Sequence, residues 1–225
     1  MASLICSGLS SYGFVSFGLG FYELFPQFDC DLDGVWTENC SVDQICQGQT
    51  TNQTAYEINY NNHTSLHNWV EQVDLVCVPS EKIGVIGSSY FVGWVCTILV
   101  LPWLADRIGR RWIYCACMFI TILSTLTMFF TKSLNVIIAM NFIAGAMNSG
   151  RLSVGFIFGN EFLTPYWQVI FGTTYNFFDG FDTMLIVMYF DWISKHYVWI
   201  ASMCVVLGII SVSGSIFVLS ESPLW

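Results

Sequence analysis

Two aspartates in one apolar stretch are the side chains of this 225-residue sequence best suited to bind a cation. Asp179 and Asp182 occur in "NFFDGFDTMLI", three positions apart, so a helix places both on one face. Ionisable groups inside a bilayer are costly and are functional candidates by default. We expect both carboxylates to face a water-filled cavity and to attract a cationic headgroup or a coupling cation. Apolar and cation–π contacts would come from nearby rings, those of Tyr175, Phe177, Phe178 and Phe181.

A third ionisable residue, Arg151, lies in the earlier apolar stretch "NSGRLSVGF". If the helix that carries the aspartates begins near residue 167, Asp179 lies about 18 Å from the inner membrane surface. Transporters bind their substrates near this depth. The sequence therefore predicts a transport pathway that includes Asp179, Asp182, Tyr175 and Arg151. The alternative is structural, with an aspartate bonded to a neighbouring helix or to Arg151.

A short turn, "LADRIGRRW" (104–112), contains three of the seven basic residues of the chain. Arginines at a membrane surface determine topology and hold carboxylates from neighbouring helices, and Gly109 permits a tight reversal. Glu161 is the expected partner of Arg110 or Arg111. The alternative is that the arginines only anchor the turn at the cytoplasmic surface. The candidate residues of this turn and its partner helix are Asp106, Arg107, Gly109, Arg110, Arg111 and Glu161.

The elements that position these residues are expected to cross a membrane. Hydrophobic residues make up 55% of the chain, charged residues 10%, and the mean hydropathy is +0.60, which is more apolar than a soluble domain can bury. Six stretches are long enough to cross a hydrocarbon core of about 30 Å as helices. They lie near 4–25, 82–105, 112–131, 134–158, 167–190 and 197–220.

Charge placement predicts the orientation of these spans, because Lys and Arg collect in short cytoplasmic loops. With the arginine turn inside, both termini lie in the cytoplasm, and the 27–80 loop and the turns holding Lys132 and Lys195 lie outside. The first span has no basic residue at its amino end and a long apolar run, so we expect a retained helix rather than a signal peptide. The 27–80 loop has no Lys or Arg and eight acidic residues: Asp29, Asp31, Asp33, Glu38, Asp43, Glu57, Glu71 and Asp74.

The same loop has the features of a secreted domain. Four of the nine cysteines lie in it, Cys30, Cys40, Cys46 and Cys77, and an even set in an oxidising compartment predicts two disulfides in one of three pairings. Three Asn-x-Ser/Thr triplets, at Asn39, Asn52 and Asn62, predict glycosylation. The alternative is that an Asn- and Thr-rich stretch produces such triplets by chance.

Other classes of function have little support in the residues. His63 and His67 have i, i+4 spacing but no third ligand, so we expect no metal site. Phosphate-binding and nucleophile motifs do not occur, which argues against an enzyme or a cofactor, and an acidic, largely apolar chain is unsuited to nucleic acid. Pairs of small residues four apart predict close helix packing: Gly155 and Gly159, Gly84 and Ser88, and Ser211 and Ser215.

Four ordered motifs resemble a known family. "LPWLADRIGRR" is similar to the signature between helices two and three of the major facilitator superfamily. "WVEQVDLVC" (69–77), "NEFLTP" (160–165) and "ESPLW" (221–225) are similar to segments of the organic cation, organic anion and carnitine transporters, solute carrier family twenty-two. The large cysteine-rich loop after the first helix is also a feature of that family. The resemblance covers nearly the whole chain and the amino-terminal six of the family's twelve helices.

The resemblance implies an all-α six-helix bundle of residues 1–225, built of two inverted three-helix repeats, with a disulfide-tied extracellular loop. It also implies that the residues of the arginine turn and Glu161 form a cytoplasmic gate, in which Asp106 meets a helix of the second half. The sequence departs from the family at four positions. Pro102 replaces a glycine, Asn141 and Leu224 replace arginines, and Gln168 lies near a basic position.

The expected function is alternating-access transport of small organic ions across the plasma membrane, with a slight preference for organic cations. The expected partners are the ion, membrane lipid, and a carboxy-terminal half or another membrane subunit. Because the chain ends within "SESPLW", we expect a piece of a longer transporter, and the alternative is a natural half that pairs. A second hypothesis is a non-transporting half-transporter that serves as a structural or accessory subunit.

Overall fold

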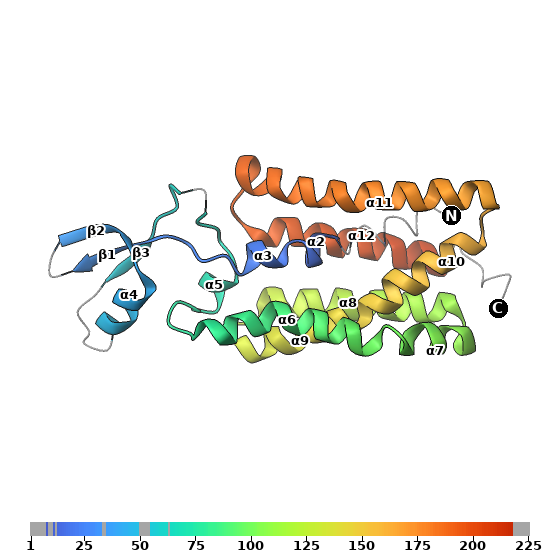
Figure 1. Ribbon diagram of the computed structural model, residues 1–225, viewed down its shortest axis with the longest axis horizontal. Coiled ribbons are helices and arrows are strands. Elements are labelled where there is room, and N and C mark those ends of the chain that lie inside the picture. Colours follow the sequence, from blue (N-terminus) through green and yellow to red (C-terminus); the bar gives the residue numbers. More distant parts are fainter. Residues whose placement is uncertain are drawn as a thin grey trace.

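The molecule is a helical bundle with a small cysteine-rich loop domain at one end (Figure 1). A computed structural model describes residues 8, 11, 13–32, 35–49, 55–62 and 64–217. The long helices run along the longest axis of the molecule, and the strands lie beyond one end of them (Figure 1). We call this end the loop end, and the opposite end, where residues 104–112 lie, the arginine end.

The described part of residues 4–25 does not form the single spanning helix that the sequence predicts. Its described part forms two short helices, α2 (Gly13–Ser16) and α3 (Leu19–Tyr22). The Tyr22 hydroxyl donates a hydrogen bond of 2.7 Å to the Phe14 carbonyl, which bridges the interruption. The turn between the two helices therefore replaces regular helical bonding with a side-chain contact.

Helix α6 (Ser80–Thr97) and helix α7 (Val100–Ile108) meet at a bend of 49°. Pro102 lies in the first turn of α7 and lacks the N–H that would continue the helical ladder across the bend. Helix α8 (Arg110–Phe130) follows at once, and α9 (Leu134–Ser149) packs along α6. The α6–α9 contact is a close one, because a methyl group added at Gly145 would overlap the Tyr90 carbonyl.

The fourth expected span is interrupted. Helix α9 passes into a π-helix, η1 (Gly150–Val154), and then into α10 (Gly155–Glu161). Helix α11 (Pro165–Met188) begins with proline, which suits a first helical position, and ends in a second π-helix, η2 (Tyr189–Ile193). Helix α12 (Tyr197–Phe217) is the last described element.

Within the described residues, α8 and α12 are long and apolar enough to cross a membrane, and the bent pair α6 and α7 is a possible third span. Helices also occupy the fourth and fifth expected spans. However, α9 ends after 16 residues at η1, and the 24-residue α11 is less apolar than α8 and α12. The chain is therefore a largely helical membrane protein with two or three clearly apolar spans in its described part.

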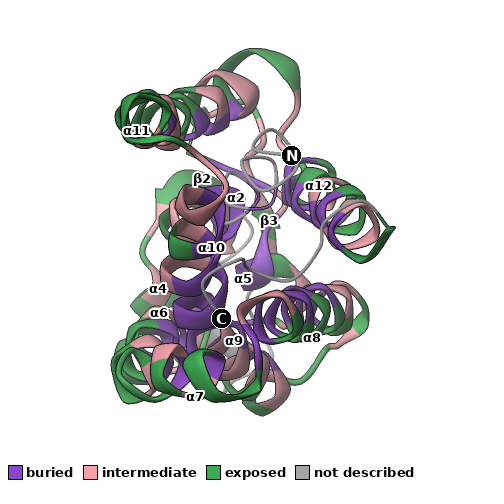
Figure 2. Cartoon of the chain, turned by 90° about the vertical axis from the view of Figure 1, so that its right-hand side faces the viewer, coloured by how far each residue is buried: buried purple, intermediate pink, exposed green. Residues whose placement is uncertain are grey.

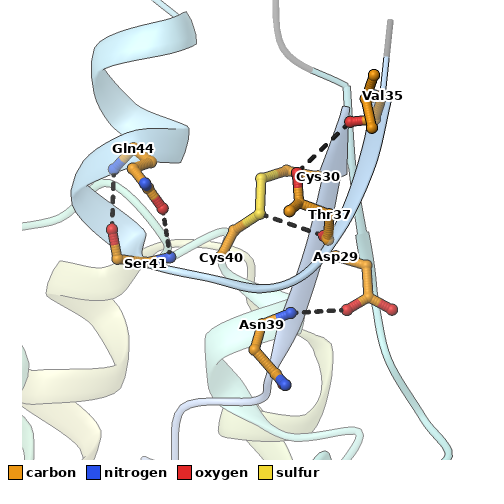
Figure 3. The surroundings of a disulfide bond; sticks show 8 residues. All are labelled: Asp29, Cys30, Val35, Thr37, Asn39, Cys40, Ser41 and Gln44. Carbon is orange, nitrogen blue, oxygen red and sulfur yellow. Dashed lines mark hydrogen bonds between the residues drawn. A yellow bond between two sulfur atoms is a disulfide. The ribbon is translucent and has the colours of Figure 1, made fainter. Parts of the chain in front are cut away.

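The cysteine-rich loop forms a three-stranded antiparallel sheet with strand order β2-β1-β3. Its strands are β1 (Phe28–Leu32), β2 (Val35–Cys40) and β3 (Tyr56–Ile58), and it also contains helices α4 (Val42–Gln49) and α5 (Trp69–Gln72). Of the three possible disulfide pairings, the structure has Cys30–Cys40 and Cys46–Cys77. Figure 3 shows the first of these between β1 and the end of β2, where it closes the β-hairpin.

Burial is concentrated where the helices face one another (Figure 2). The largest apolar cluster lies toward the loop end and includes an aromatic group of Tyr22, Trp69 and Tyr197, whose rings are 5.3–6.2 Å apart. Helix α11 stands at the edge of the bundle with few purple segments in Figure 2. Only Phe171, Asp182 and Ile186 are buried on it, so most of its surface is uncovered in this chain.

Candidate functional site

The two aspartates of α11 lie in different surroundings. Asp182 is only 4% exposed and packs against helix α2, where a methyl group added at Gly13 would lie 2.8 Å from its Oδ2 atom. Asp179, one turn earlier, is partly exposed. Neither Asp179 Oδ1 nor Asp182 Oδ2 has a hydrogen-bond partner in the described part of the chain. The expectation that both carboxylates face a water-filled cavity is therefore wrong for Asp182, because α2 covers it.

The aromatic residues of α11 do not gather around the carboxylates as a group. Tyr175 shares the helix face of the aspartates, by the 3.6-residue period, and its ring packs on Phe156 of α10 at 5.9 Å. Phe177 and Phe181 stack on each other at 6.1 Å on another face, where Phe177 is 67% exposed. Of the rings named from the sequence, Tyr175 is thus the one best placed beside the aspartate face.

Arg151 lies in the π-helix η1 and points into the bundle, with 2% of its surface exposed. It lies close enough to Cys117 of α8 and Cys204 of α12 to interact with both thiols. A π-helix inside an α-helical segment often marks a functional position. The contacts of Asp179 and Asp182 in the described structure do not include Arg151, so the proposed structural alternative, an Asp–Arg151 pair, is not formed.

At the arginine end, Arg110 joins three helices. Its Nε and Nη2 atoms donate to Asp106 Oδ1 of α7 at 3.1 and 2.8 Å, and Nη1 forms an ion pair with Glu161 of α10. The Glu161 side chain is only 8% exposed. Gly109 has a φ of 117°, which L-residues with a side chain rarely adopt, so a glycine makes the reversal between α7 and α8. Of the two arginines predicted as alternatives, Arg110 is the one that pairs with Glu161.

The other two arginines have separate contacts. The Arg111 guanidinium donates to the backbone carbonyls of Ser215 and Ile216, at the last turn of α12. A cation at a helix carboxyl end is favourable because the last carbonyls lack helical partners. Arg107 lies over the Trp103 ring at 4.0 Å. Asp106 contacts Arg110 within this chain, whereas the resemblance implied a contact with a second half.

Two of the departures from the family pattern satisfy backbone carbonyls. Asn141 is fully buried and donates to the Ile86 carbonyl of α6 at 3.1 Å. Gln168 donates to the carbonyls of Asn160, in the last turn of α10, and Leu163, just after that helix, at 3.0 and 3.1 Å. Uncharged amides can therefore hold these helices together without a buried charge. Leu224 lies outside the described residues.

Two amides that were not predicted from the sequence connect the cysteine-rich loop to the bundle. Asn68 donates to the carbonyls of Phe21 and Leu24 at the end of α3, at 3.0 and 2.7 Å. Gln72 donates to the carbonyls of Met128 and Thr131 at the end of α8, at 3.0 and 2.7 Å. Their i, i+4 spacing within the "NWVEQ" segment is the signal that could have indicated a shared face.

Of the two histidines with i, i+4 spacing, His67 is described, and His63 lies outside the described residues. The His67 ring stacks on that of His196 at 4.0 Å, and its Nδ1 atom lies 2.7 Å from Glu71 Oε2. No group of three potential metal ligands occurs among the residues that the structure describes.

The glycosylation triplets also differ in their surroundings. Asn39 is exposed on β2, and its backbone N–H donates to Asp29 at 3.1 Å (Figure 3). The side-chain amide of Asn62 donates to Gln27, and Asn62 is partly buried. Asn52 lies outside the described residues. Of the two described triplets, Asn39 is the more accessible.

Comparisons with known proteins agree with this architecture. A family model described as sugar (and other) transporter matches residues 42–225. Solute carrier family 22 member 4 of Mus musculus is 28% identical over 138 residues, which cover 59% of this chain and 25% of that protein. Solute carrier family 22 member 15-like proteins of Xenopus tropicalis and Xenopus laevis are each 27% identical over 110 residues, 48% of this chain and 22% of theirs.

The matched part of this chain thus spans about a quarter of the length of these relatives, which are transporters rather than enzymes. The family model covers most of the chain, including the arginine turn, η1 and α11. These matches support the resemblance to the amino-terminal half of solute carrier family twenty-two. The chain therefore belongs to the sugar (and other) transporter family, a family of membrane transporters of the major facilitator kind.

Proposed function

We propose that this chain supplies the amino-terminal half of a transporter that moves small organic ions by alternating access, with a slight preference for organic cations. The observation that carries the proposal is the pair of carboxylates on α11, which have oxygen atoms without hydrogen-bond partners in the described residues. Unpartnered carboxylates within a membrane attract cations. The electrostatic attraction between the two charges is stronger there than in water, because the dielectric constant is lower.

Asp179 is the residue of this pair that contacts the transported ion. It is partly exposed, whereas helix α2 covers Asp182 at Gly13. Fourteen positions separate Asp179 from the start of α11 at Pro165, a rise of about 21 Å. Tyr175 lies on the same face, one turn away, where its ring could contact an organic cation.

The full arrangement is six spans, with residues 1–225 as a transmembrane half-domain of two inverted repeats and 27–80 as the extracellular loop. Helices along the second to sixth expected spans support it. The uncovered surface of α11 supports a partner, since a carboxy-terminal half would face the same pathway. Asp106, Arg107, Gly109, Arg110, Arg111 and Glu161 would form the cytoplasmic gate around the ion pairs of Arg110.

Glycosylation tests the orientation, in which the loop lies outside and both termini lie in the cytoplasm of a plasma-membrane protein. Glycans are attached only where a loop enters the secretory lumen. We expect enzymatic deglycosylation to lower the apparent mass of the protein from transfected cells, and Asn39→Gln to remove more of that shift than Asn62→Gln, because Asn39 is exposed. A protein without glycan, whose loop is labelled only after the cells are permeabilised, would exclude this orientation.

Transport is tested by uptake of labelled organic cations and organic anions into cells that express the chain alone or with a carboxy-terminal half from the family. We expect saturable cation uptake with the second half present, and about a tenfold lower uptake efficiency for Asp179→Asn, as for the loss of one charge-assisted contact. The matched control is Asp191→Asn, an exposed aspartate of η2 beyond the end of α11, which should transport normally.

A second candidate function is that of a non-transporting subunit of a membrane complex. The observation that favours it is the large uncovered apolar surface of α11, which another protein could cover permanently. The absence of uptake in both settings, with the chain delivered to the cell surface and glycosylated, would favour this role. Equal cation uptake by the wild type and Asp179→Asn would instead leave transport in place and remove Asp179 from the pathway.

A further inference from the structure

A cavity of about 370 Å³ opens at the loop end, away from the aspartates of α11. Three segments that are distant in the sequence form it: the chain around α5, the turn after α8, and the start of α12. Its volume lies within the range of small-molecule sites, about 300–1,000 Å³. The lining residues are His67, Asn68, Glu71, Gln72, Lys132, His196, Tyr197 and Val198.

Hydrogen bonds hold these three segments together. Gln72 donates to the Thr131 carbonyl at 2.7 Å, which keeps Lys132 beside α5. The His67 N–H donates to the Lys195 carbonyl at 2.9 Å, and the Tyr197 N–H donates to the His67 carbonyl at 3.2 Å. These backbone bonds place His196 next to His67, where the two rings stack. These hydrogen bonds therefore fix the relative positions of the three segments that line the cavity, at the junction between the loop and the bundle.

The negative charge in the cavity is already engaged. The Glu71 carboxylate lies 2.7 Å from His67 Nδ1 and accepts a hydrogen bond from the Tyr60 hydroxyl. Partial burial and the neighbouring Glu71 raise the pKa of Tyr60 to about 12, so this hydroxyl keeps its proton at neutral pH and remains a donor. The Glu71 carboxylate therefore already has two hydrogen-bond donors, His67 and Tyr60.

Two side chains in the cavity can still donate hydrogen bonds to a ligand. Lys132 and the ring of His196 have no hydrogen-bond or ion-pair partner among the described residues, apart from the stacking of His196 on His67. The neighbouring Lys195 differs, because its ammonium group donates to the carbonyls of Tyr60 and Asn62 at 2.5 and 2.6 Å. The free groups of the cavity are thus cationic or protonatable donors.

We propose that this cavity is a second ligand site, distinct from the transport pathway, in which Lys132 and His196 bind the carboxylate or phosphate group of a small anion. Both side chains are exposed and line the cavity, so their donors are accessible to a solute at the loop end. Charge-assisted hydrogen bonds from ammonium and imidazolium groups to oxyanions are about twice as strong as neutral ones. Val198, which is exposed, supplies an apolar wall for the rest of the molecule. The other ionisable groups that line the site are His67 and Glu71, whose side chains contact each other.

The experiment measures thermal unfolding of the full chain in discs of neutral lipid while inorganic phosphate or acetate is added. A parallel arm replaces part of the neutral lipid with anionic phospholipid and adds no salt. The variants are Lys132→Gln and His196→Gln. The control is Lys82→Gln, an exposed lysine in the first turn of α6 that does not line the cavity.

We expect saturable stabilisation by phosphate or acetate, with about a tenfold weaker apparent affinity in Lys132→Gln and no change in Lys82→Gln. Stabilisation by anionic phospholipid alone, also lost in Lys132→Gln and His196→Gln, would identify a lipid headgroup as the source of the same oxyanion. Absence of stabilisation by all three probes, or equal loss in Lys82→Gln, would overturn the site. The unliganded melting temperatures show whether each variant folds.

Discussion

At the scale of single residues, the arginine turn shows how three like charges acquire different roles. Arg110 pairs with Asp106 and Glu161, Arg111 caps the end of α12, and Arg107 lies on Trp103. Contacts with distant segments contribute to these different roles. Ser215, for example, whose carbonyl accepts a hydrogen bond from Arg111, lies 104 positions away in the sequence. The turn therefore holds α7, α8, α10 and α12 together, in addition to any effect on topology.

Arg110→Gln should destabilise the bundle by about 3 kcal/mol, because it leaves the carboxylate of the nearly buried Glu161 without its ion-pair partner. Arg107→Gln is the matched control, since Arg107 is exposed and contacts Trp103. Thermal unfolding in detergent measures both variants, and Arg110→Gln should melt well below the wild type. Equal melting temperatures for the two variants would show that the Arg110–Glu161 pair contributes little to stability.

At the scale of secondary structure, glycines determine how closely two helices approach. Gly93 of α6 and Gly145 of α9 face the backbone of the opposite helix, so a methyl group at either position would overlap a carbonyl. By contrast, Gly84 has no atom within 4 Å of an added methyl group and is exposed. The predicted packing pair of Gly84 and Ser88 therefore has no helix packed against it within the described residues, because its face of α6 points away from α9.

Gly145→Ala should lower stability by about 2–3 kcal/mol, since the obstacle is the Tyr90 backbone, which cannot rotate away as a side chain could. Gly84→Ala is the control on α6 and should be neutral or slightly stabilising, because alanine favours helix. The measurement is the midpoint of unfolding in detergent, together with the yield of folded protein. A folded Gly145→Ala variant with wild-type stability would contradict the close α6–α9 approach.

At the scale of the whole molecule, the cysteine-rich loop is connected to several helices at once. Asn68 and Gln72 hold the ends of α3 and α8, and Cys46–Cys77 ties α4 to the segment just before α6. Ile45 and Val76, the residues next to this disulfide, are buried in the small core of the loop. The loop therefore acts as a cap on the bundle, and its disulfides stabilise the cap.

Removing Cys46–Cys77 by a double Cys→Ser substitution should loosen the loop more than removing Cys30–Cys40. The sequence separations are 31 and 10 residues, and loop-closure entropy gives stabilisation of about 4 and about 3 kcal/mol, respectively. Limited chymotrypsin digestion of the folded protein reports the difference, with faster cleavage expected without Cys46–Cys77. Faster cleavage of the variant without Cys30–Cys40 would reverse this order.

Much of the chain was predictable from local patterns. Long apolar runs indicated the positions of α8 and α12 within a few residues, because hydropathy is a property of the segment itself. The four motifs led to the transporter family, which the family model confirms over residues 42–225. Opposite charges and loop position also predicted that Glu161 pairs with Arg110 or Arg111, and in the structure its partner is Arg110.

The rest depended on contacts between distant segments. Sequence spacing places Asp179 and Asp182 on one face of a helix, but only the packing of α2 at Gly13 buries Asp182 and leaves Asp179 partly exposed. Likewise, four cysteines allow three pairings, and the sheet that aligns β1 with β2 selects Cys30–Cys40. Residue type and spacing thus determined which groups could interact, whereas the tertiary structure decided which of them meet, because packing and desolvation depend on neighbours that lie far away in the sequence.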